Sequence, residues 1–402
     1  MRVAILGMGT IGSGVLNTIE TNNDIITDYI GEPLEVTHIF SRTVRNIHDN
    51  DLTGIEQVTD VEKLKEIDVD IVIEVMGGME TTRDILQSFL SRGIHVVSAN
   101  KDMLASYVDD LSHVGNQNKA QLSYEASSAG GIPIINAIQY HLNANKLNRI
   151  MGILNGTTNY ILTKMTNENW DYEKALKEAQ DIGFAEADPT NDVKGFDAQR
   201  KITLLSRLAY KRKIDVKEVP AQGIDEIDVK DIEIAKNTGY TIKLLGMSEL
   251  EDDKLNISVA PALLPSDHQL AYVEEGMNAV YVNGNVIGEA MFYGPGAGSM
   301  ETASAVVSDA MNIARFGFTG NFETDQTVEV SAEDSESKYY IRFADSQETA
   351  EQYLNEKDIS FTTLQAGEDF TIQTRALSKE AVQEIQEALE TAAVYEIVGD
   401  ED

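Results

Sequence analysis

The chain has 402 residues, of which 42% are hydrophobic, so two or three domains with sizeable cores are expected. Its formal net charge of −35 argues against nucleic acid or an anionic membrane as a partner, because like charges repel. The absence of cysteine excludes disulfides, thiolate metal sites and cysteine nucleophiles, and no apolar run approaches the roughly 20 residues that span a bilayer.

Strand and helix patterns alternate over the first 130 residues. Strands are expected over residues 2–6, 35–40, 71–75 and 95–98, and helices over residues 12–30 and 81–92. Because parallel strands need such crossover helices, this alternation predicts a parallel sheet. The first strand pattern begins at once, without a cationic segment, apolar core and cleavage site before it. We therefore expect no signal peptide and a cytoplasmic location.

Beyond residue 133 the order becomes irregular, which predicts a separate α+β domain. Helices are expected there over residues 158–166, 172–180 and 193–212. After residue 320 a β-α-β-β-α-β pattern predicts a small ferredoxin-like module, with elements over residues 339–343, 348–356, 360–365, 369–374, 379–389 and 394–398. Residues 321–402 carry 21 acidic against five basic side chains, which we interpret as a solvated acidic surface. The fold class is thus α/β: a Rossmann-type domain, an α+β domain and a small terminal module.

A glycine-rich loop joins the first strand to the first helix, with the sequence Gly7-Met8-Gly9-Thr10-Ile11-Gly12. Bare backbone at this position can approach a pyrophosphate at the positive end of the helix. The glycines could instead serve only a tight turn, but their place directly after an apolar strand favours cofactor binding. The motif predicts a nicotinamide dinucleotide, NADP or NAD, bound by Gly7, Gly9, Thr10, Ile11 and Gly12.

Two further landmarks follow strands of the predicted sheet. Arg42 comes after the second strand, where an acidic residue would bind the ribose hydroxyls of NAD. An arginine suits a 2′-phosphate and favours NADP, although a solvated arginine in an enzyme that accepts either cofactor remains an alternative. Ser98, Asn100 and Lys101 follow the strand over residues 95–98, which places a lysine at the carboxyl edge of the sheet, beside the expected cleft.

Carboxylates and a lysine gather in residues 183–201. Asp197 and Lys201 are four residues apart, so on a helix they form either an ordinary surface pair or a positioned acid–base pair. Glu186 and Asp192 lie nearby and could hold the ammonium group of a substrate. In a chain this acidic the cluster could also be fortuitous, and spacing alone does not separate these interpretations.

In order along the chain, these motifs resemble those of the homoserine dehydrogenase family. The resemblance runs nearly end to end and rests on the glycine loop and on residues 99–101, 124–133, 154–162, 183–201 and 294–305. It implies a reversible NADPH- or NADH-dependent reduction of aspartate 4-semialdehyde to homoserine, in threonine, methionine and isoleucine biosynthesis.

The resemblance also implies roles for individual residues. Lys101 and Lys201 would flank the reacting carbonyl, and Glu186, Asp192 and Asp197 would hold the amino acid. Gly156 and Thr157 would complete the substrate pocket. Further cofactor contacts would come from Gly77, Ser98, Asn100, Lys101, Gly296 and Glu301. A monovalent cation, sodium or potassium, would be bound by the side chain of Glu125 and by the carbonyls of Ser128, Gly130 and Ile132.

The family implies a domain organisation as well. The dinucleotide-binding domain would cover residues 1–132 and be completed by a returning helix within residues 299–320. The catalytic domain, residues 133–298, would form a homodimer, and residues 321–402 would be a shortened ACT-like module. This module lacks the glycine turn of the usual effector site, so an interaction or structural role is at least as well supported as feedback control.

The expected chemistry is a hydride transfer to a carbonyl held in the cleft between the domains. Lys201, assisted or substituted by Lys101, would stabilise the alkoxide and supply its proton. Because the chain has no cysteine, oxidation of an aldehyde through an acyl-enzyme is excluded. Two alternatives stay open: a Rossmann-type reductase of another amino-acid aldehyde or imine, and a nicotinamide-binding sensor without turnover.

Overall fold

The computed structural model describes residues 1–41, 52–330 and 336–399, which divide into two compact units. Unit 1 comprises residues 1–146, 203–216 and 292–327. Unit 2 comprises residues 147–202, 217–291 and 328–402. No helix within the described ranges is long and apolar enough to cross a membrane.

Unit 1 contains a six-stranded sheet in the order β3-β2-β1-β4-β5-β6, and all of its strand pairs are parallel. The strands are β1 (Arg2–Leu6), β2 (Glu35–Phe40), β3 (Glu56–Val58), β4 (Ile71–Glu74), β5 (His95–Ser98) and β6 (Leu122–Ser123). The central strand β1 is a run of apolar residues, and its last four side chains are fully buried, as a parallel sheet covered on both faces requires. The parallel sheet predicted from the alternating pattern is confirmed.

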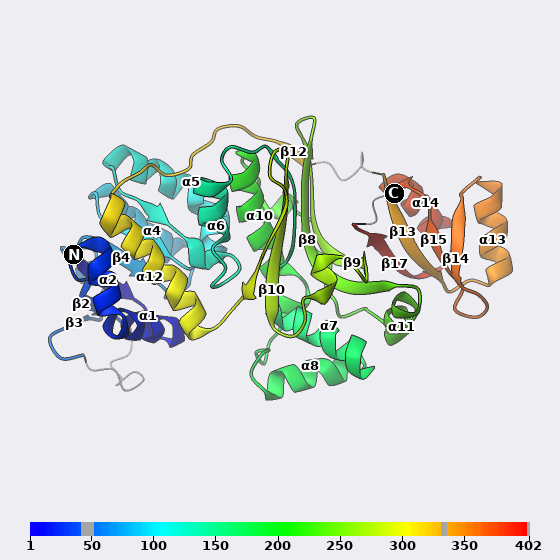
Figure 1. The fold of residues 1–402 in the computed structure, drawn as a ribbon, viewed down its shortest axis with the longest axis horizontal. Helices are drawn as coiled ribbons and strands as arrows, with labels where there is room; N and C mark the ends of the chain where they lie inside the picture. Colours follow the sequence, from blue (N-terminus) through cyan, green and yellow to red (C-terminus); the bar gives the residue numbers. More distant parts are fainter. Residues whose placement is uncertain (42–51, 331–335, 400–402) are drawn as a thin grey trace. The chain divides into compact units, whose positions relative to one another are not determined.

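Helices cover this sheet (Figure 1). They are α1 (Thr10–Thr21), α2 (Asn23–Ile30), α3 (Val61–Leu64), α4 (Glu80–Ser91), α5 (Lys101–Asn118), α6 (Ile134–Asn136) and α12 (Ser299–Phe316), with short turns η1 (Glu125–Ser127) and η2 (Ala137–His141). The single helix predicted over residues 12–30 is wrong, because Asn22 has non-helical backbone angles and ends α1 before α2 begins.

Helix α12 comes from much later in the chain, within the range of the expected returning helix. It packs against α1, where the Ser299 hydroxyl donates a hydrogen bond to the Thr10 carbonyl at 2.7 Å. Figure 1 shows it in yellow among the blue and cyan elements of unit 1. Its apolar side chains Ala303, Val306 and Ala310 join the core that surrounds β1. A late segment therefore completes the unit that carries the glycine loop.

Unit 2 is built on an eleven-stranded mixed sheet, whose main path runs β11-β10-β7-β8-β9-β17-β13-β15-β14. Its strands are β7 (Leu147–Ile153), β8 (Tyr240–Glu251), β9 (Lys254–Pro265), β10 (Met277–Gly284), β11 (Gly288–Pro295), β12 (Glu329–Val330), β13 (Glu336–Phe343), β14 (Phe361–Gln365), β15 (Thr371–Thr374), β16 (Leu377–Ser378) and β17 (Thr391–Ile397). The hairpin β8–β9 keeps a continuous antiparallel register from Tyr240↔Pro265 to Glu251↔Lys254.

The helices of the central and terminal segments are α7 (Gly156–Glu168), α8 (Tyr172–Asp181), α9 (Thr190–Val193), α10 (Phe196–Tyr210), α11 (Val229–Asn237), α13 (Gln347–Glu356) and α14 (Lys379–Ala388), with η3 (Val216–Glu218) and η4 (Gln269–Tyr272). The helix predicted over residues 193–212 begins only at Phe196, because Gly195 has a φ of +80° that interrupts it. Asp197 therefore lies in the first turn of α10.

The terminal segment has the predicted β-α-β-β-α-β order, in β13, α13, β14, β15, α14 and β17, with the strand order β17-β13-β15-β14. Its sheet does not stand apart. Strand β17 pairs in parallel with β9, through Glu396↔Ala262 and Ile397↔Leu263, so the terminal strands continue the central sheet. A buried ion pair between Arg342 of β13 and Asp231 of α11 joins the same two parts.

Candidate functional site

The glycine loop lies between β1 and α1, as the motif predicts. A Cβ atom on Gly12 would lie 1.9 Å from the Gly7 carbonyl oxygen, so this position tolerates no side chain. Gly9, by contrast, has no heavy atom within 4 Å of where its Cβ would stand. Helix α1 begins next to it at Thr10 and carries no acidic residue in its first turn. An open backbone at an uncompensated positive helix end suits a pyrophosphate.

A buried acid organises the neighbouring strand ends. The Glu74 carboxylate, at the end of β4, accepts hydrogen bonds from the amides of Met76 and Gly77 and from the Ser98 hydroxyl, the last at 2.6 Å. Burial raises its pKa above the usual value for a glutamate. The Ser98 hydroxyl also accepts from the Asn100 amide. Three predicted cofactor residues, Gly77, Ser98 and Asn100, are thus connected at one edge of the sheet.

Lys101 begins α5 at this same edge. The Asn100 side chain caps the helix by accepting from the Met103 amide, and its amide group donates to the Gly78 carbonyl at 2.8 Å. Lys101 is partly exposed beside the capped turn. Gly296 lies against the Gly130 backbone, and Glu301 lies in the first turn of α12. Arg42 falls outside the described residues.

The predicted substrate residues of unit 2 converge on Lys201. Its amine forms an ion pair with Asp197, Nζ to Oδ2 2.7 Å, and donates to the Leu154 carbonyl, also at 2.7 Å. The Asn155 side chain donates to Asp197 at 2.9 Å and to Asp192 at 2.7 Å. Lys201 and Asp197 are both buried. The pair is therefore not an ordinary surface pair, which was one interpretation of its spacing.

The start of α7 borders this cluster. Asn155 caps the helix by accepting from the Thr158 amide at 2.9 Å. A Cβ on Gly156 would lie 2.6 Å from the Gly276 carbonyl oxygen, so close packing alone accounts for a glycine there. The Thr157 hydroxyl donates to the Phe184 carbonyl at 2.9 Å. Glu186 is exposed, and within the described ranges its side chain forms no ion pair or hydrogen bond that links it to Asp192 or Asp197.

Glu125, one of the predicted cation ligands, is a second buried acid. The Glu125 carboxylate accepts from the amides of Ile135 and Asn136 at 2.8 and 2.7 Å, while the Glu125 amide donates to Asp309. Burial and the charge of Asp309 raise the pKa of Glu125 to about 8, and burial raises that of Asp309 to about 6. In the described part of the chain neither carboxylate has a lysine, arginine or histidine partner.

Two hydroxyl groups of this loop also lack a hydrogen-bond partner among the described residues. They belong to Ser127 and Ser128, and both are buried. Uncompensated acids and free hydroxyl oxygens are the ligands that hard cations prefer. The residues that are present therefore fit a cation.

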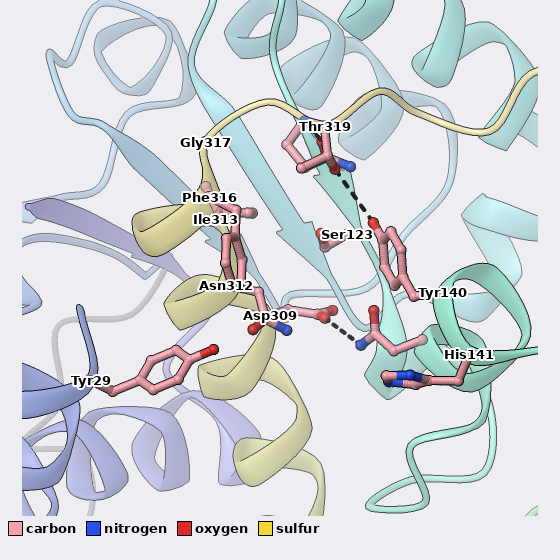
Figure 2. A pocket seen from close by; sticks show the side chains of 12 residues that line it. Tyr29, Ser123, Tyr140, His141, Asp309, Asn312, Ile313, Phe316, Gly317 and Thr319 are labelled. Atoms are coloured by element: carbon pink, nitrogen blue, oxygen red, sulfur yellow. Dashed lines mark hydrogen bonds between the residues drawn. The ribbon is translucent and has the colours of Figure 1, made fainter.

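A cavity of about 450 Å³ in unit 1 reaches this acidic pair. Asp309 and Asn136 line it and are joined by a hydrogen bond of 3.2 Å, and Tyr29, Tyr140 and Phe316 are the exposed aromatic residues of its wall (Figure 2). Among the described residues, none of those predicted to act in catalysis, substrate binding or cofactor binding lines this cavity. It is therefore a route from solvent to the acids rather than the site of hydride transfer.

Comparisons with known proteins agree with this arrangement. A family model described as homoserine dehydrogenase matches residues 133–311, and another, the NAD-binding domain of homoserine dehydrogenase, matches residues 7–125. The homoserine dehydrogenase of Bacillus subtilis is 45% identical over 325 residues, which are 80% of this chain and 75% of that protein. The chain belongs to the homoserine dehydrogenase family. It is therefore an NAD(P)-dependent oxidoreductase, and the resemblance found in its motifs is confirmed.

Solved structures lead to the same family. A homoserine dehydrogenase from Thiobacillus denitrificans has a TM-score of 0.91 and 31% identity, with 99% of this chain and 98% of that chain covered. A hyperthermophilic archaeal homoserine dehydrogenase in complex with NADPH has a TM-score of 0.67 and 28% identity, over 79% of this chain and 98% of that chain. The α/β fold class is confirmed, and the family's cofactor is a nicotinamide dinucleotide.

Sequence reasoning missed three residues that organise these sites. Glu74 could have been noticed as a single acid directly after the apolar run of β4. The Asn155 side chain donates hydrogen bonds to both Asp192 and Asp197, but an asparagine before a helix is usually only a helix cap. Asp309 lies in the middle of an amphipathic helix, and no local signal marks it as the neighbour of Glu125.

Proposed function

We propose that this chain reduces L-aspartate 4-semialdehyde to L-homoserine, reversibly, with a bound nicotinamide cofactor. The observation that carries the proposal is the buried Lys201–Asp197 pair, which Asn155 and the Leu154 carbonyl hold in place. An ammonium group in this setting can stabilise the negative charge that develops on a carbonyl oxygen and can return a proton to it. The reduced cofactor supplies the hydride.

The remaining residues take positioning roles in this proposal. Asp192 and Asp197 attract the substrate's α-ammonium group, because both are acids and Asn155 fixes them side by side. Glu186 is exposed and contributes to the same charge at longer range. Lys101 acts from the cofactor-binding unit, and both lysines are needed for full turnover. Gly156 and Thr157 shape the pocket from the start of α7.

The test is the consumption of NADPH with aspartate 4-semialdehyde, with succinate semialdehyde as a matched substrate that lacks the α-ammonium group. We expect turnover with the first aldehyde and a much lower kcat/KM with the second, because the acidic cluster has no charge to bind in succinate semialdehyde. Binding of NADPH without any turnover would favour the non-catalytic sensor. Equal turnover of both aldehydes would contradict recognition of the ammonium group.

The cofactor preference is the next part of the proposal. Arg42 follows β2, at the position that contacts the adenosine ribose in dinucleotide-binding folds, and we propose that it favours NADPH. We expect Arg42→Ala to raise the KM for NADPH by about tenfold and to leave the KM for NADH nearly unchanged, since only NADPH carries the 2′-phosphate. Arg83→Ala, at a partly exposed arginine of α4 that pairs with Asp84, is the control. A KM for NADPH that does not respond would mean that Arg42 is a solvated loop residue.

We also propose that a monovalent cation, sodium or potassium, binds at Glu125 with the carbonyls of Ser128, Gly130 and Ile132. The buried acids Glu125 and Asp309, which lack a cationic side-chain partner in the described part of the chain, support this site. The ion would offset their charge and steady the loop, and no proton or hydride step depends on it.

The cation proposal predicts ion-specific stabilisation. The Tm should be higher in sodium or potassium chloride than in tetramethylammonium chloride at the same ionic strength, because the larger ion does not fit among these ligands. Glu125→Gln should remove that difference, whereas the exposed Asp110→Asn should keep it. An equal Tm in all three salts would show that the site takes no monovalent ion.

We propose a homodimer formed through unit 2, and a cytoplasmic location. Strand β11 is an edge of the described unit 2 sheet and exposes Met291, and the turn before it exposes Val286 and Ile287. Exposed apolar side chains at the edge of a sheet are typical of an interface. Light scattering should give twice the chain mass of 44.2 kDa. A mass of 44.2 kDa at micromolar concentration would contradict the dimer.

A further inference from the structure

A lysine in the middle of unit 2 takes no part in the proposed reaction. Lys243 lies on β8, and its side chain is almost fully buried, with 3% of the residue exposed. Its amine donates to the Asn159 side-chain oxygen at 3.2 Å and to the Val273 carbonyl at 2.5 Å. Both acceptors are neutral. Burial lowers the pKa of this amine to about 8, so at neutral pH it is still mainly an ammonium.

The other buried cationic side chains in the described ranges differ from Lys243 in one respect. Lys201 pairs with Asp197, Arg207 with Asp109 and Arg342 with Asp231. Lys243 forms no ion pair with any described residue. An isolated ammonium group costs several kcal/mol to bury, so an unpaired buried lysine calls for a partner from outside the chain.

Lys243 also lines a cavity of about 350 Å³. Lys236 of α11 supplies a second amine to this lining, and the hydroxyl-bearing residues Thr166, Thr241 and Ser266 also belong to it. Thr163 lines the cavity too, but its hydroxyl already donates to the Asn159 carbonyl at 2.7 Å. The Lys236 amine donates to the Thr166 carbonyl at 3.2 Å. Tyr272, which is 72% exposed, stands on the cavity wall and marks its opening to solvent.

The acids near this cavity have other partners. Glu274 lines the cavity and accepts from the neutral Asn167 amide at 3.2 Å; its charge favours the ammonium form of Lys243, but the two form no ion pair in the described part of the chain. Glu275 pairs with Lys164 at 3.2 Å. Two amines against one acid make the lining positive, in a chain whose net charge is −35. Local positive charge and clustered hydroxyl groups match the donors that bind small anions.

We propose that the cavity around Lys243 binds a small oxyanion, a carboxylate or a phosphate group, whose oxygens take the place of the missing acidic partner. The hydroxyl groups of Thr166, Thr241 and Ser266 supply further donors, and Lys236 adds charge at a second point of the wall. The Asn159 amide that contacts Lys243 also donates to the carbonyls of Val273, Glu275 and Met277. Asn159 belongs to helix α7, so the Lys243 hydrogen bond connects the cavity to the helix that starts at the proposed substrate pocket.

Calorimetric titration of the full chain with inorganic phosphate and with acetate, at constant ionic strength, tests this proposal. We expect saturable binding of at least one of the two, weakened about tenfold or more by Lys243→Gln and less strongly by Lys236→Gln. Lys177→Gln, an exposed lysine on α8, should bind as the wild type does. Saturation by phosphate alone or by acetate alone identifies the anion. Saturation by neither, or equal binding by Lys243→Gln and wild type, would overturn the proposal.

A measurement on the unaltered chain covers the case in which Lys243→Gln does not fold. Cyanate carbamylates neutral amines, and mass spectrometry gives the rate at each lysine. The anion that saturates in the titration should slow carbamylation of Lys243 severalfold and leave that of Lys177 unchanged. An unchanged rate at Lys243 in saturating anion would place the bound anion elsewhere. Neither anion binding nor the carbamylation rate depends on turnover, so both measurements test the anion site whether or not the chain reduces aspartate 4-semialdehyde.

Discussion

Lys201→Ala should lower kcat for aspartate 4-semialdehyde about 10²- to 10³-fold while NADPH still binds with its normal affinity. The amine is the cationic group at the centre of the substrate cluster, and it is positioned by Asp197 at 2.7 Å and by the Leu154 carbonyl. Removing it takes away charge stabilisation of the developing alkoxide and the proton that completes the alcohol. NADPH affinity, followed by its fluorescence, should not change because the glycine loop is in the other unit.

Three comparisons separate this role from a structural one. Lys201→Arg keeps the charge but not the proton-transfer chemistry of an amine, so we expect it to fold and to remain well below wild-type kcat. Lys177→Ala, an exposed lysine on α8, should be unaffected. Lys101→Ala tests the second lysine and should also lower kcat. Full kcat in Lys201→Ala would disprove the assignment of this residue, and loss of NADPH binding with it would indicate misfolding.

The cofactor half of the site was predictable because it is local in sequence. A strand, a glycine turn and a helix follow one another within about twenty residues. The Gly7 carbonyl, which leaves no room for a side chain at Gly12, belongs to the same loop. The predicted strands over residues 2–6, 35–40 and 95–98 match β1, β2 and β5 in their bounds. Hydrophobic runs and crossover spacing are sufficient for such a sheet.

The substrate half depends on contacts that no short pattern contains. The spacing of Asp197 and Lys201 was visible in the sequence. The burial of the pair and its hydrogen bonds to Asn155 and to the Leu154 carbonyl, more than forty residues earlier, were not. From the sequence, Glu186 and Asp192 were equally good candidates for binding the substrate. In the structure Asp192 accepts a hydrogen bond from Asn155, whereas Glu186 is exposed. Lys243 gave no signal at all, since a lysine in a strand pattern normally faces solvent.

The terminal segment shows the same limit for the fold. Its β-α-β-β-α-β order follows from local periodicity, whereas its attachment through β17 and β9 pairs residues more than 130 positions apart. Sequence periodicity says which residues face one side of a strand, but not which distant strand it joins. The predicted order of strands and helices is therefore found in the terminal segment. The pairing that joins this segment to the central sheet could not be predicted from the sequence.

That attachment leads to the largest expected effect on stability. Asp231, fully buried on α11, accepts two hydrogen bonds from the Arg342 guanidinium at 2.7 and 2.8 Å and one from the Tyr340 hydroxyl at 2.7 Å. Asp231→Asn should destabilise unit 2 by about 3–5 kcal/mol, because it removes the one fully buried counter-charge of the guanidinium. The acids that remain, Asp228 at 3.5 Å and Asp369 at 3.8 Å, are farther away and partly exposed. The urea midpoint of the full chain, followed by circular dichroism, measures the loss.

The neighbouring Asp228 provides the matched control. Its carboxylate lies 3.5 Å from the same guanidinium but is 48% exposed, so Asp228→Asn should cost at most about 1 kcal/mol. The double variant Asp231→Leu with Arg342→Met removes both charges and should be more stable than Asp231→Asn, since no unpaired charge remains buried. Equal midpoints for the two single asparagine variants would mean that water or another acid compensates Arg342. The ion pair would then not be what fastens the terminal strands to α11.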